Sequence, residues 1–335
     1  MIEAPADILF ITVSRIGDTL FTTPALRAVA AAYPQARITV LGHPKRAEVF
    51  EHLPFVHRVG SITTRRAPWL GRLGAPRFDL AFVFGFDRPL LAYALRTARR
   101  VVAFEQGDAD LNRRLYAAVP RPPFQSEHAV RQLLRLPAAL GIAAAGMRLA
   151  YRVAPAEAAA ARQQLAAIAG RPRIGLQVAS FPTKAYRDWP IDHFAQLCAR
   201  VSARWPQAHF LIFGGPEEKQ RTHWLKEQLG AHASLFAGRL SLRQTAALMA
   251  ETDLYVGVDT GPTHLMSTFD IPLVGLYHCI SGSQLTGPLD HPLAQLIDHP
   301  ATGSGRCQET SPMADITVDA VFARVEQALA GLAPR

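Results

Sequence analysis

The chain has 335 residues, 49% of them hydrophobic, and a formal net charge of +9. This length is enough for two domains of ordinary size. No apolar run approaches the roughly 18–20 residues that a membrane-spanning helix requires, which excludes a helical integral membrane protein. The three cysteines, Cys198, Cys279 and Cys307, are far apart and odd in number. Their spacing predicts neither a zinc site nor a disulfide framework and favours the reducing cytoplasm.

The positive charge lies in one half of the chain. Residues 1–168 contain 22 Lys and Arg against 12 Asp and Glu, whereas residues 169–335 contain 14 against 15. An excess confined to one half favours an anionic partner for that half, such as an acidic substrate, a membrane surface or nucleic acid. The alternative is an arginine-rich composition with solvated faces.

The first half alternates predicted strands and helices, an order that is typical of a parallel sheet covered by helices. The predicted strands are Ile8–Val13, Arg37–Leu41, Phe55–Val59, Phe78–Phe84 and Val101–Phe104, and the predicted helices are Pro24–Tyr33, Ala47–His52, Pro89–Ala98, Glu127–Leu140 and Pro155–Ala169. No basic segment precedes the first apolar run and no small-residue cleavage site follows it, so it is a strand rather than a signal peptide. Ser14–Thr19 is predicted as a loop, with Thr23 as the N-cap of the helix that follows.

One segment of the first half interrupts this rhythm. Thr63–Arg77 places Trp69 and Leu70 among four arginines, with Pro and Gly throughout. A solvated basic loop and a contact with a membrane surface both remain open interpretations.

The alternation restarts after Gly170-Arg171-Pro172, which predicts two domains, 1–169 and 170–335. The second half is predicted as strands Ile174–Val178, His209–Phe213, Ser234–Phe236 and Leu273–Tyr277, with a further buried strand that starts at Leu254 and ends at Asp259, and as helices Ile191–Trp205, Glu217–Leu229, Ser241–Met249 and Val318–Leu332. The last helix could pack back on the first domain. Two such α/β domains are expected to face a cleft lined by the ends of their strands.

The stretch Leu254–Leu265 predicts a buried strand that leads into a helix through a very short turn. Gly261 permits close approach of a backbone or a ligand, and Pro262 suits the first helical turn. The free N–H groups of this turn and the helix dipole favour an anion such as a diphosphate, with Asp259 at the strand end and His264 one turn along. The alternative is an ordinary strand–turn–helix in which Asp259 and Thr260 are caps.

Three further stretches carry candidate site residues. Asp18 follows the first strand and is a candidate general base, or else a cap or partner of Arg15. Thr183, Lys184 and Arg187 follow the first strand of the second domain, where the cations could neutralise a leaving diphosphate or simply lie on the surface. Glu217 and Glu218 follow Gly214-Gly215-Pro216 and could accept bonds from sugar hydroxyls or act as ordinary first-turn acids.

Several motifs are absent or weak. No P-loop, dinucleotide-binding fingerprint, nucleophile elbow or H-E-x-x-H pattern is present. Asp108-Ala109-Asp110 lies in a predicted loop among arginines, so no metal site is predicted.

Two motifs together resemble glycosyltransferase family 9, the ADP-heptose:lipopolysaccharide heptosyltransferases. Arg15-Ile16-Gly17-Asp18-Thr19 with Thr23-Pro24-Ala25-Leu26 resembles the opening of the family, and Val258-Asp259-Thr260-Gly261-Pro262-Thr263-His264 resembles its Asp-Thr-Gly-x-x-His donor motif. Trp189-Pro190 resembles the end of a Lys-x-Trp-Pro segment, but Arg187 stands in the place of the family's lysine and Lys184 lies three residues earlier. The cation that holds the diphosphate therefore stays open between these two.

The resemblance implies a GT-B fold, with two Rossmann-like, doubly wound domains and an inverting transfer that needs no metal and no cofactor. It implies Asp18 as the base and a donor site of Asp259, Thr260, Gly261 and His264, with Leu240 under the adenine and Glu217 or Glu218 near the donor. Arg15, Thr19, Arg65 and Arg66 are expected at an anionic acceptor, the inner core of lipopolysaccharide. The expected place is the cytoplasm, with a contact to the inner membrane left open.

Two other functions stay open from the sequence. One is a transferase of the same fold with a different nucleotide-sugar or a non-lipid acceptor, which the substitution at the lysine position permits. The other is a non-catalytic protein that binds nucleotides or nucleic acid through the basic half. Only Trp69 interleaves an aromatic ring with the arginines, so no nucleic-acid partner is predicted.

Overall fold

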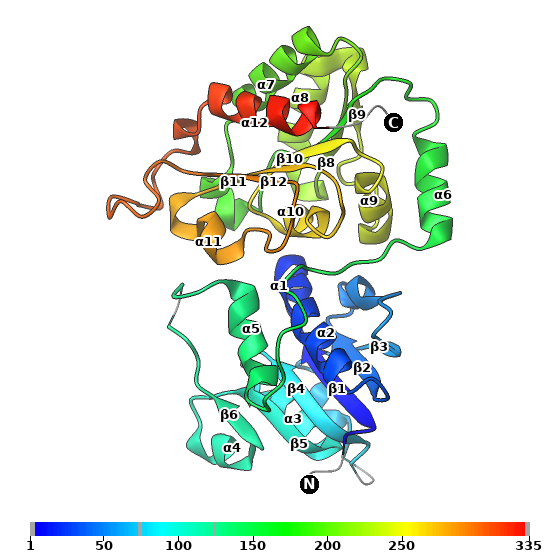
Figure 1. The fold of residues 1–335 in the computed structure, drawn as a ribbon, viewed down its shortest axis with the longest axis vertical. Coiled ribbons are helices and arrows are strands. Elements are labelled where there is room, and N and C mark those ends of the chain that lie inside the picture. The colour runs from blue at the N-terminus through cyan, green and yellow to red at the C-terminus, as the bar shows by residue number, and fades with distance from the viewer. Residues whose placement is uncertain (1–3, 73–75, 124, 332–335) are drawn as a thin grey trace. The chain divides into compact units, whose positions relative to one another are not determined.

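The computed structural model describes residues 4–72, 76–123 and 125–331. It consists of two compact units, Met1–Arg152 and Val153–Arg335, each with its own six-stranded parallel sheet. Helices cover both faces of each sheet (Figure 1). This is the doubly wound α/β architecture that the alternating pattern predicts.

The sheet of the first unit has the strand order β3-β2-β1-β4-β5-β6. Its strands are β1 (Asp7–Thr12), β2 (Arg37–Gly42), β3 (Arg58–Ser61), β4 (Phe78–Phe84), β5 (Ala98–Phe104) and β6 (Ala117–Val119). Its helices are α1 (Ile16–Phe21), α2 (Thr23–Ala32), α3 (Arg88–Thr97), α4 (Ala109–Arg114) and α5 (Ala129–Ala138), with short 3-10 turns η1 (Ala47–Phe50) and η2 (Ala67–Trp69).

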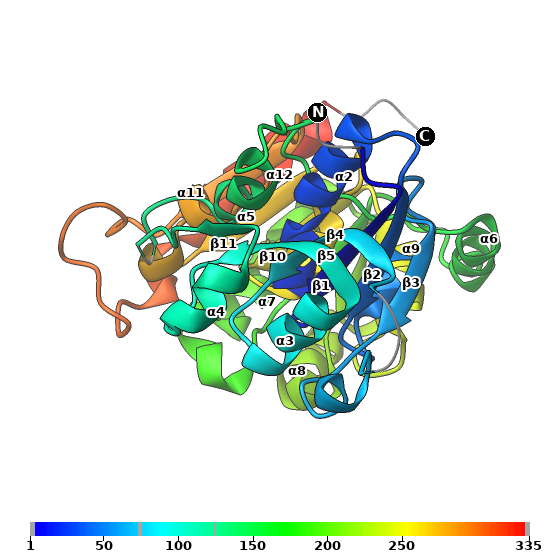
Figure 2. The same ribbon diagram turned by 90° about the horizontal axis from the view of Figure 1, so that it is seen from below.

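Alternation of side chains along β1 divides the core of this unit into two layers. Ile8 and Phe10 pack with α2 and α5 on one face, and Leu9 and Ile11 pack with α3 and η2 on the other. The view from below shows these helices on opposite sides of the strands (Figure 2). Because both faces are buried, the central strands are continuous apolar runs rather than alternating ones.

The sheet of the second unit has the order β12-β11-β10-β7-β8-β9. Its strands are β7 (Arg173–Gln177), β8 (His209–Phe213), β9 (Ala233–Leu235), β10 (Leu254–Val258), β11 (Leu273–Tyr277) and β12 (Ala294–Asp298). Its helices are α6 (Pro155–Gln164), α7 (Ile191–Arg204), α8 (Lys219–Leu229), α9 (Leu242–Met249), α10 (Gly261–Met266), α11 (Ser283–Thr286) and α12 (Val318–Ala330), with 3-10 turns η3 (Pro182–Arg187), η4 (Pro216–Glu218), η5 (Gly230–His232), η6 (Cys279–Ser281) and η7 (Met313–Asp315).

The division between the units differs from the predicted one. It lies between Arg152 and Val153 rather than between residues 169 and 170. The reason is that α6 packs on α9 and forms an ion pair between Glu157 and Arg243, so it is part of the second unit. The last helix, α12, likewise belongs to that unit, because Val321 and Val325 lie in its core.

Three local predictions are wrong. Residues 16–21 form α1 instead of a loop, and Asp108 caps a short helix, α4, instead of lying in a loop. Thr23 is not a cap: its hydroxyl donates to the carbonyl of Leu20 and accepts from the amide of Ala150.

The expectation of unpaired cysteines is also wrong, because Cys279 and Cys307 form a disulfide. Cys279 lies two residues after the end of β11 and Cys307 lies in the long loop after β12, so their proximity follows from tertiary structure and not from spacing. Cys198 is the buried free cysteine. Among the described residues, no helix is long and apolar enough to cross a membrane.

Candidate active site

Each sheet has one place where the strand order reverses, and predicted site residues of each unit follow strands at that place: Asp18 in the first unit, and Arg187 and Asp259 in the second. In the second unit the reversal falls between β7 and β10, and in the first between β1 and β4. Loops that leave two adjacent strands in opposite directions open a crevice at the carboxyl ends of those strands, where doubly wound folds bind their ligands.

The centre of the site in the second unit is the carboxylate of Asp259, whose side chain is 0% exposed. Nη1 of Arg187 lies 2.8 Å from its Oδ2, and Nε2 of His264 lies 3.3 Å from its Oδ1. The hydroxyl of Thr286 donates to Oδ1 at 3.2 Å. A buried carboxylate with a guanidinium and an imidazole around it is a fixed scaffold for two side chains that bind anions.

The electrostatics of this cluster follow from its burial. Burial alone would raise the pKa of Asp259, but the hydrogen bond and charge of His264 and the charge of Arg187 hold it below its ordinary value. Asp259 is therefore ionised at neutral pH. Its carboxylate is enclosed, and it holds the side chains of Arg187 and His264 on either side of it.

The two candidate cations are placed differently. Both lie over the ring of Tyr186, with the Nζ of Lys184 and the guanidinium carbon of Arg187 each 5.5 Å from the ring centre. Arg187 also forms the ion pair with Asp259 and donates to the main-chain carbonyl of Asp259 at 3.4 Å. It is thus Arg187 that joins the loop after β7 to the turn after β10. Thr183 is exposed beside them.

The turn after β10 forms as the sequence predicts. Thr260 is the N-cap residue of α10 and has extended backbone angles, but its side chain makes no cap hydrogen bond. Its hydroxyl donates instead to the carbonyl of Val258 at 3.3 Å. Thr260 and Gly261 are half-buried, which leaves the first turn of α10 partly accessible.

The remaining predicted donor residues lie after β8 and β9. Glu218 accepts hydrogen bonds from the amide of Gly215 at 2.7 Å and the side-chain amide of Gln177 at 3.3 Å, and burial raises its pKa. These contacts give it a structural role at the start of α8. Glu217 is exposed at the same turn, and Leu240 is half-buried just before α9.

In the first unit, Asp18 lines a pocket of about 200 Å³ at the β1/β4 reversal. Residues at or just after the ends of β1, β4 and β5 line it, together with two polar side chains from later in the chain: Thr12, Ser14, Phe84, Gly85, Phe86 and Phe104, and Arg121 and Gln132. The guanidinium of Arg121 lies 4.2 Å from the centre of the Phe86 ring. The pocket therefore combines a carboxylate, a cation and an apolar face, which suits an anionic sugar.

The other predicted acceptor residues do not line this pocket. Thr19 is 1% exposed, and its hydroxyl donates to the carbonyl of Arg15 within α1. Arg15 is exposed at the start of α1, and Arg65 and Arg66 are exposed in the loop after β3. Their assignment to the acceptor stays a prediction.

Phe86, Arg121 and Thr286 were missed from the sequence. The only signal for Phe86 was its place just after an apolar strand, next to Gly85. That signal becomes specific only when β4 is known to lie beside β1.

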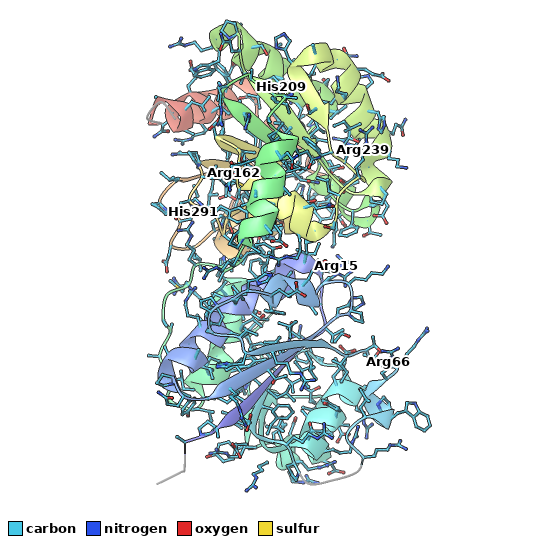
Figure 3. The ribbon with its side chains drawn as sticks, turned by 90° about the vertical axis from the view of Figure 1, so that its right-hand side faces the viewer. Arg15, Arg66, Arg162, His209, Arg239 and His291 are labelled. Carbon is cyan, nitrogen blue, oxygen red and sulfur yellow. A yellow bond between two sulfur atoms is a disulfide. The ribbon has the colours of Figure 1, made fainter. Side chains whose placement is uncertain are left out.

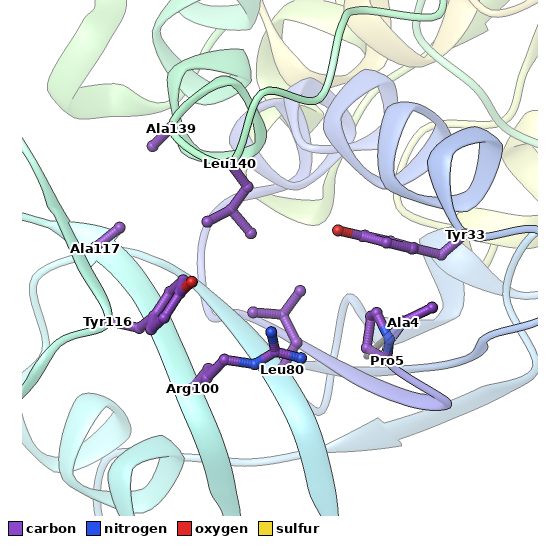
Figure 4. Close-up of a pocket in the computed structure, with 9 residues that line it drawn as sticks. All are labelled: Ala4, Pro5, Tyr33, Leu80, Arg100, Tyr116, Ala117, Ala139 and Leu140. Carbon is purple, nitrogen blue, oxygen red and sulfur yellow. The ribbon is translucent and has the colours of Figure 1, made fainter. Parts of the chain in front are cut away.

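A larger cavity, of about 490 Å³, lies at the opposite edge of the same sheet. Its lining includes Pro5 before β1, and Leu80, Arg100 and Ala117 in the first three residues of β4, β5 and β6 (Figure 4). Parallel α/β sheets bind ligands at the carboxyl edge, so this cavity is not the candidate active site.

One group of three potential metal ligands occurs among the described residues: His278, Cys279 and Cys307. Both sulfur atoms are used in the disulfide, and the imidazole accepts from the amide of Ile280 and contacts the carbonyl of Ser311. In this state the group offers no free sulfur ligand, and the expectation of a metal-free enzyme stays a prediction.

Comparison with known proteins identifies the family. The family model of glycosyltransferase family 9 (heptosyltransferase) matches residues 89–313. The lipopolysaccharide core heptosyltransferase OpsX of Haemophilus influenzae is 21% identical over 82% of this chain and 80% of its own length. A family 9 glycosyltransferase structure from Veillonella parvula superposes with a TM-score of 0.84 at 18% identity, covering 98% of both chains. The structure of E. coli heptosyltransferase WaaC with ADP gives 0.73 at 20%, covering 96% of this chain and 99% of that one.

These likenesses confirm the predicted GT-B architecture, since the two six-stranded parallel sheets match those of solved heptosyltransferases. The family match covers more than half of the chain. The chain therefore belongs to glycosyltransferase family 9, the heptosyltransferases, and is a glycosyltransferase.

Proposed function

We propose that this protein transfers a heptose from ADP-heptose to the anionic inner core of lipopolysaccharide, with inversion at the anomeric carbon and without a metal. The observation that carries the proposal is the pair of sites at the strand reversals: a buried Asp259 that orients Arg187 and His264, and a pocket lined by Asp18. ADP is the nucleotide bound by the related WaaC structure, which supports it as the nucleotide here.

In the proposed reaction, the diphosphate binds against Arg187 and the first turn of α10. Asp18 accepts the proton of an acceptor hydroxyl, and the oxygen attacks the anomeric carbon from the face opposite the diphosphate. The new glycosidic C–O bond forms as the bond to the phosphate oxygen breaks, and ADP leaves with its charge stabilised by fixed cations. Arg121 and Phe86 would hold an acidic sugar of the acceptor beside Asp18. Transfer requires that the acceptor hydroxyl and the anomeric carbon of the donor come into contact.

The proposed compartment is the cytoplasm, as the sequence analysis expects. The Cys279–Cys307 disulfide is the feature that points the other way, because stable disulfides are rare in reducing compartments. In that compartment we expect the pair to be reduced, at least in part.

The test is a transfer assay with ADP-heptose and a delipidated core oligosaccharide, read by the mass increase of the acceptor. Loss of a general base lowers turnover by about 10²–10⁴-fold, so Asp18→Asn should do so. Asp110→Asn, a change of the same chemistry at an exposed residue of α4, is the control and should retain activity. Near-normal turnover of Asp18→Asn would refute the role of Asp18.

A donor screen tests the sugar nucleotide separately. ADP should raise the melting temperature more than UDP or GDP at equal concentration, because a ligand of the native state stabilises it by mass action. A larger shift with UDP or GDP would favour the alternative of a same-fold transferase with a different donor.

A further inference from the structure

The loop after β3 exposes two large apolar side chains on a well-built turn. We call residues 63–72 the Trp69 loop. Trp69 is 73% exposed and Leu70 is 43% exposed, whereas Ala67 of the same turn and Ile62 just before it are 0% and 1% exposed within the core of the first unit. The buried pair anchors the loop and the exposed pair forms its tip.

The tip is held in place by hydrogen bonds rather than frayed. The amide of Ala67 donates to the carbonyl of Thr63 at 2.9 Å, and that of Trp69 to the carbonyl of Arg66 at 3.0 Å. Nη2 of Arg96, from α3, donates to the carbonyls of Ala67 at 2.7 Å and Leu70 at 3.0 Å. Exposure of the indole is therefore part of the folded structure, and a large apolar side chain held in water favours a partner surface.

The charged side chains of the loop itself have a single sign. Arg65, Arg66 and Arg72 belong to the loop, and no Asp or Glu occurs in the sequence from Ser61 to Arg77. The guanidinium of Arg72 lies 4.8 Å from the centre of the Trp69 ring. Arg66 extends outward from the first unit (Figure 3). The partner that complements this surface is anionic and also accepts an indole and a leucine.

An anionic lipid bilayer has this combination. Its headgroups attract arginines, and its interface accommodates an indole next to an aliphatic side chain. Single-stranded nucleic acid is a poorer fit, because proteins that bind it stack successive bases on several aromatic side chains, and Trp69 is the one aromatic residue of the Trp69 loop.

We propose that the Trp69 loop docks the first unit on an anionic lipid surface, with Trp69 and Leu70 in the interface and Arg65, Arg66 and Arg72 on the headgroups. The inference rests on the proposed function only in explaining why the protein would bind lipid: a glycolipid acceptor would be embedded in such a surface. It assigns Arg65 and Arg66 to lipid headgroups rather than to the sugars of the acceptor.

The test is sedimentation of the full chain with vesicles made of equal parts phosphatidylglycerol and phosphatidylcholine, compared with vesicles of phosphatidylcholine alone. Binding is expected to the first kind only. Each arginine near an anionic surface contributes about a fivefold gain in binding, so Arg65→Ala with Arg66→Ala should weaken it about 25-fold. Trp69→Ser with Leu70→Ser should weaken it roughly tenfold or more. Controls are Arg113→Ala with Arg114→Ala, on α4, and Trp224→Ser, on α8, which change exposed residues of the same kinds.

The outcomes separate this inference from the proposed function. Absence of vesicle binding, or equal loss in the control variants, overturns the docking surface while transfer to the delipidated acceptor stands. Loss with the arginine variant but not with Trp69→Ser and Leu70→Ser also overturns it, because the binding would then be purely electrostatic. Vesicle binding that depends on both pairs supports docking even if no heptose is transferred.

Discussion

Replacing Asp259 by Asn should weaken the binding of ADP even though its carboxylate cannot reach a ligand in this structure. Its side chain is 0% exposed, and its partner Arg187 is 22% exposed. Removing one partner of a buried ion pair costs about 3–5 kcal/mol of stability. Because Arg187 keeps some contact with solvent, we expect the lower end, about 3 kcal/mol.

The expected loss of affinity comes from Arg187. A hydrogen bond to a charged group contributes about 1.5–3 kcal/mol, so a guanidinium that no longer has a fixed position should cost roughly 10–100-fold in the Kd of ADP. Arg187→Ala should cost as much. If Asp259 acts only through Arg187, the double variant should resemble Arg187→Ala to within about 0.5 kcal/mol.

Isothermal titration calorimetry with ADP on the wild type, both single variants and the double variant measures this cycle. Lys184→Ala is the matched control: its Nζ lies over the same Tyr186 ring but the ion pair with Asp259 is made by Arg187. We expect it to change the Kd by less than about threefold, because a half-buried lysine outside that ion pair should contribute no more than about 0.6 kcal/mol. A folded Asp259→Asn protein that binds ADP as tightly as the wild type would refute the reasoning, as would a larger loss for Lys184→Ala than for Arg187→Ala.

Three further predictions concern stability. Reducing Cys279–Cys307, which closes a segment with a sequence separation of 28, should cost about 3.5 kcal/mol of unfolding free energy; an unchanged melting temperature in dithiothreitol would contradict this. The pKa of Asp259 is lower in the folded protein than its ordinary value of 3.8. The stabilisation by its ionised carboxylate is therefore complete above pH 3.8 and is lost as the pH falls through the pKa of the folded state. The difference in unfolding free energy between the wild type and Asp259→Asn should therefore shrink below pH 3.8. A difference that stays constant with pH would contradict stabilisation by the ionised carboxylate. Trp189→Phe removes the 2.7 Å hydrogen bond that Nε1 donates to the carbonyl of Ile316, and should lower the free energy of unfolding by about 1–3 kcal/mol in urea titrations. An unchanged free energy of unfolding would contradict a structural role for this bond.

The strands were predictable to within a few residues because central parallel strands are buried on both faces and are written as apolar runs. β4, for example, has the predicted bounds, and β10 ends at Val258, one residue before the predicted end at Asp259. α1 was not predictable, because its six residues include Gly17, Asp18 and Thr19, which are weak helix formers. Its helical form depends on burying Leu20 and Phe21. β12 was missed because it is an edge strand whose residues are all only half-buried.

The residue types of the site were predictable, whereas their contacts were not. Sequence spacing left Lys184 and Arg187 as equal candidates, because a 3-10 turn with a non-helical residue at Lys184 separates them in a way that no periodicity reveals. The structure distinguishes them through Asp259, which directly follows the neighbouring strand β10 but is 72 residues away in sequence. The motif around Asp259 predicted a ligand contact, which stays a prediction, and the ion pair of the buried carboxylate with Arg187 could not be predicted from it.

The strand order explains why such contacts escape the sequence. In each unit, the chain first builds outward from a central strand, β1 or β7, and then returns to the other side of it with β4 or β10. The two loops at the reversal are therefore far apart in sequence and adjacent in space. For this reason Asp18 and Phe86 line one pocket, and Arg187 forms an ion pair with Asp259. A sequence motif lies within one loop, so it identifies the candidate residues of that loop and not those of the adjacent loop. Which loop is adjacent is determined by topology, which is why the family motifs locate the chemistry but not the residues that hold it in position.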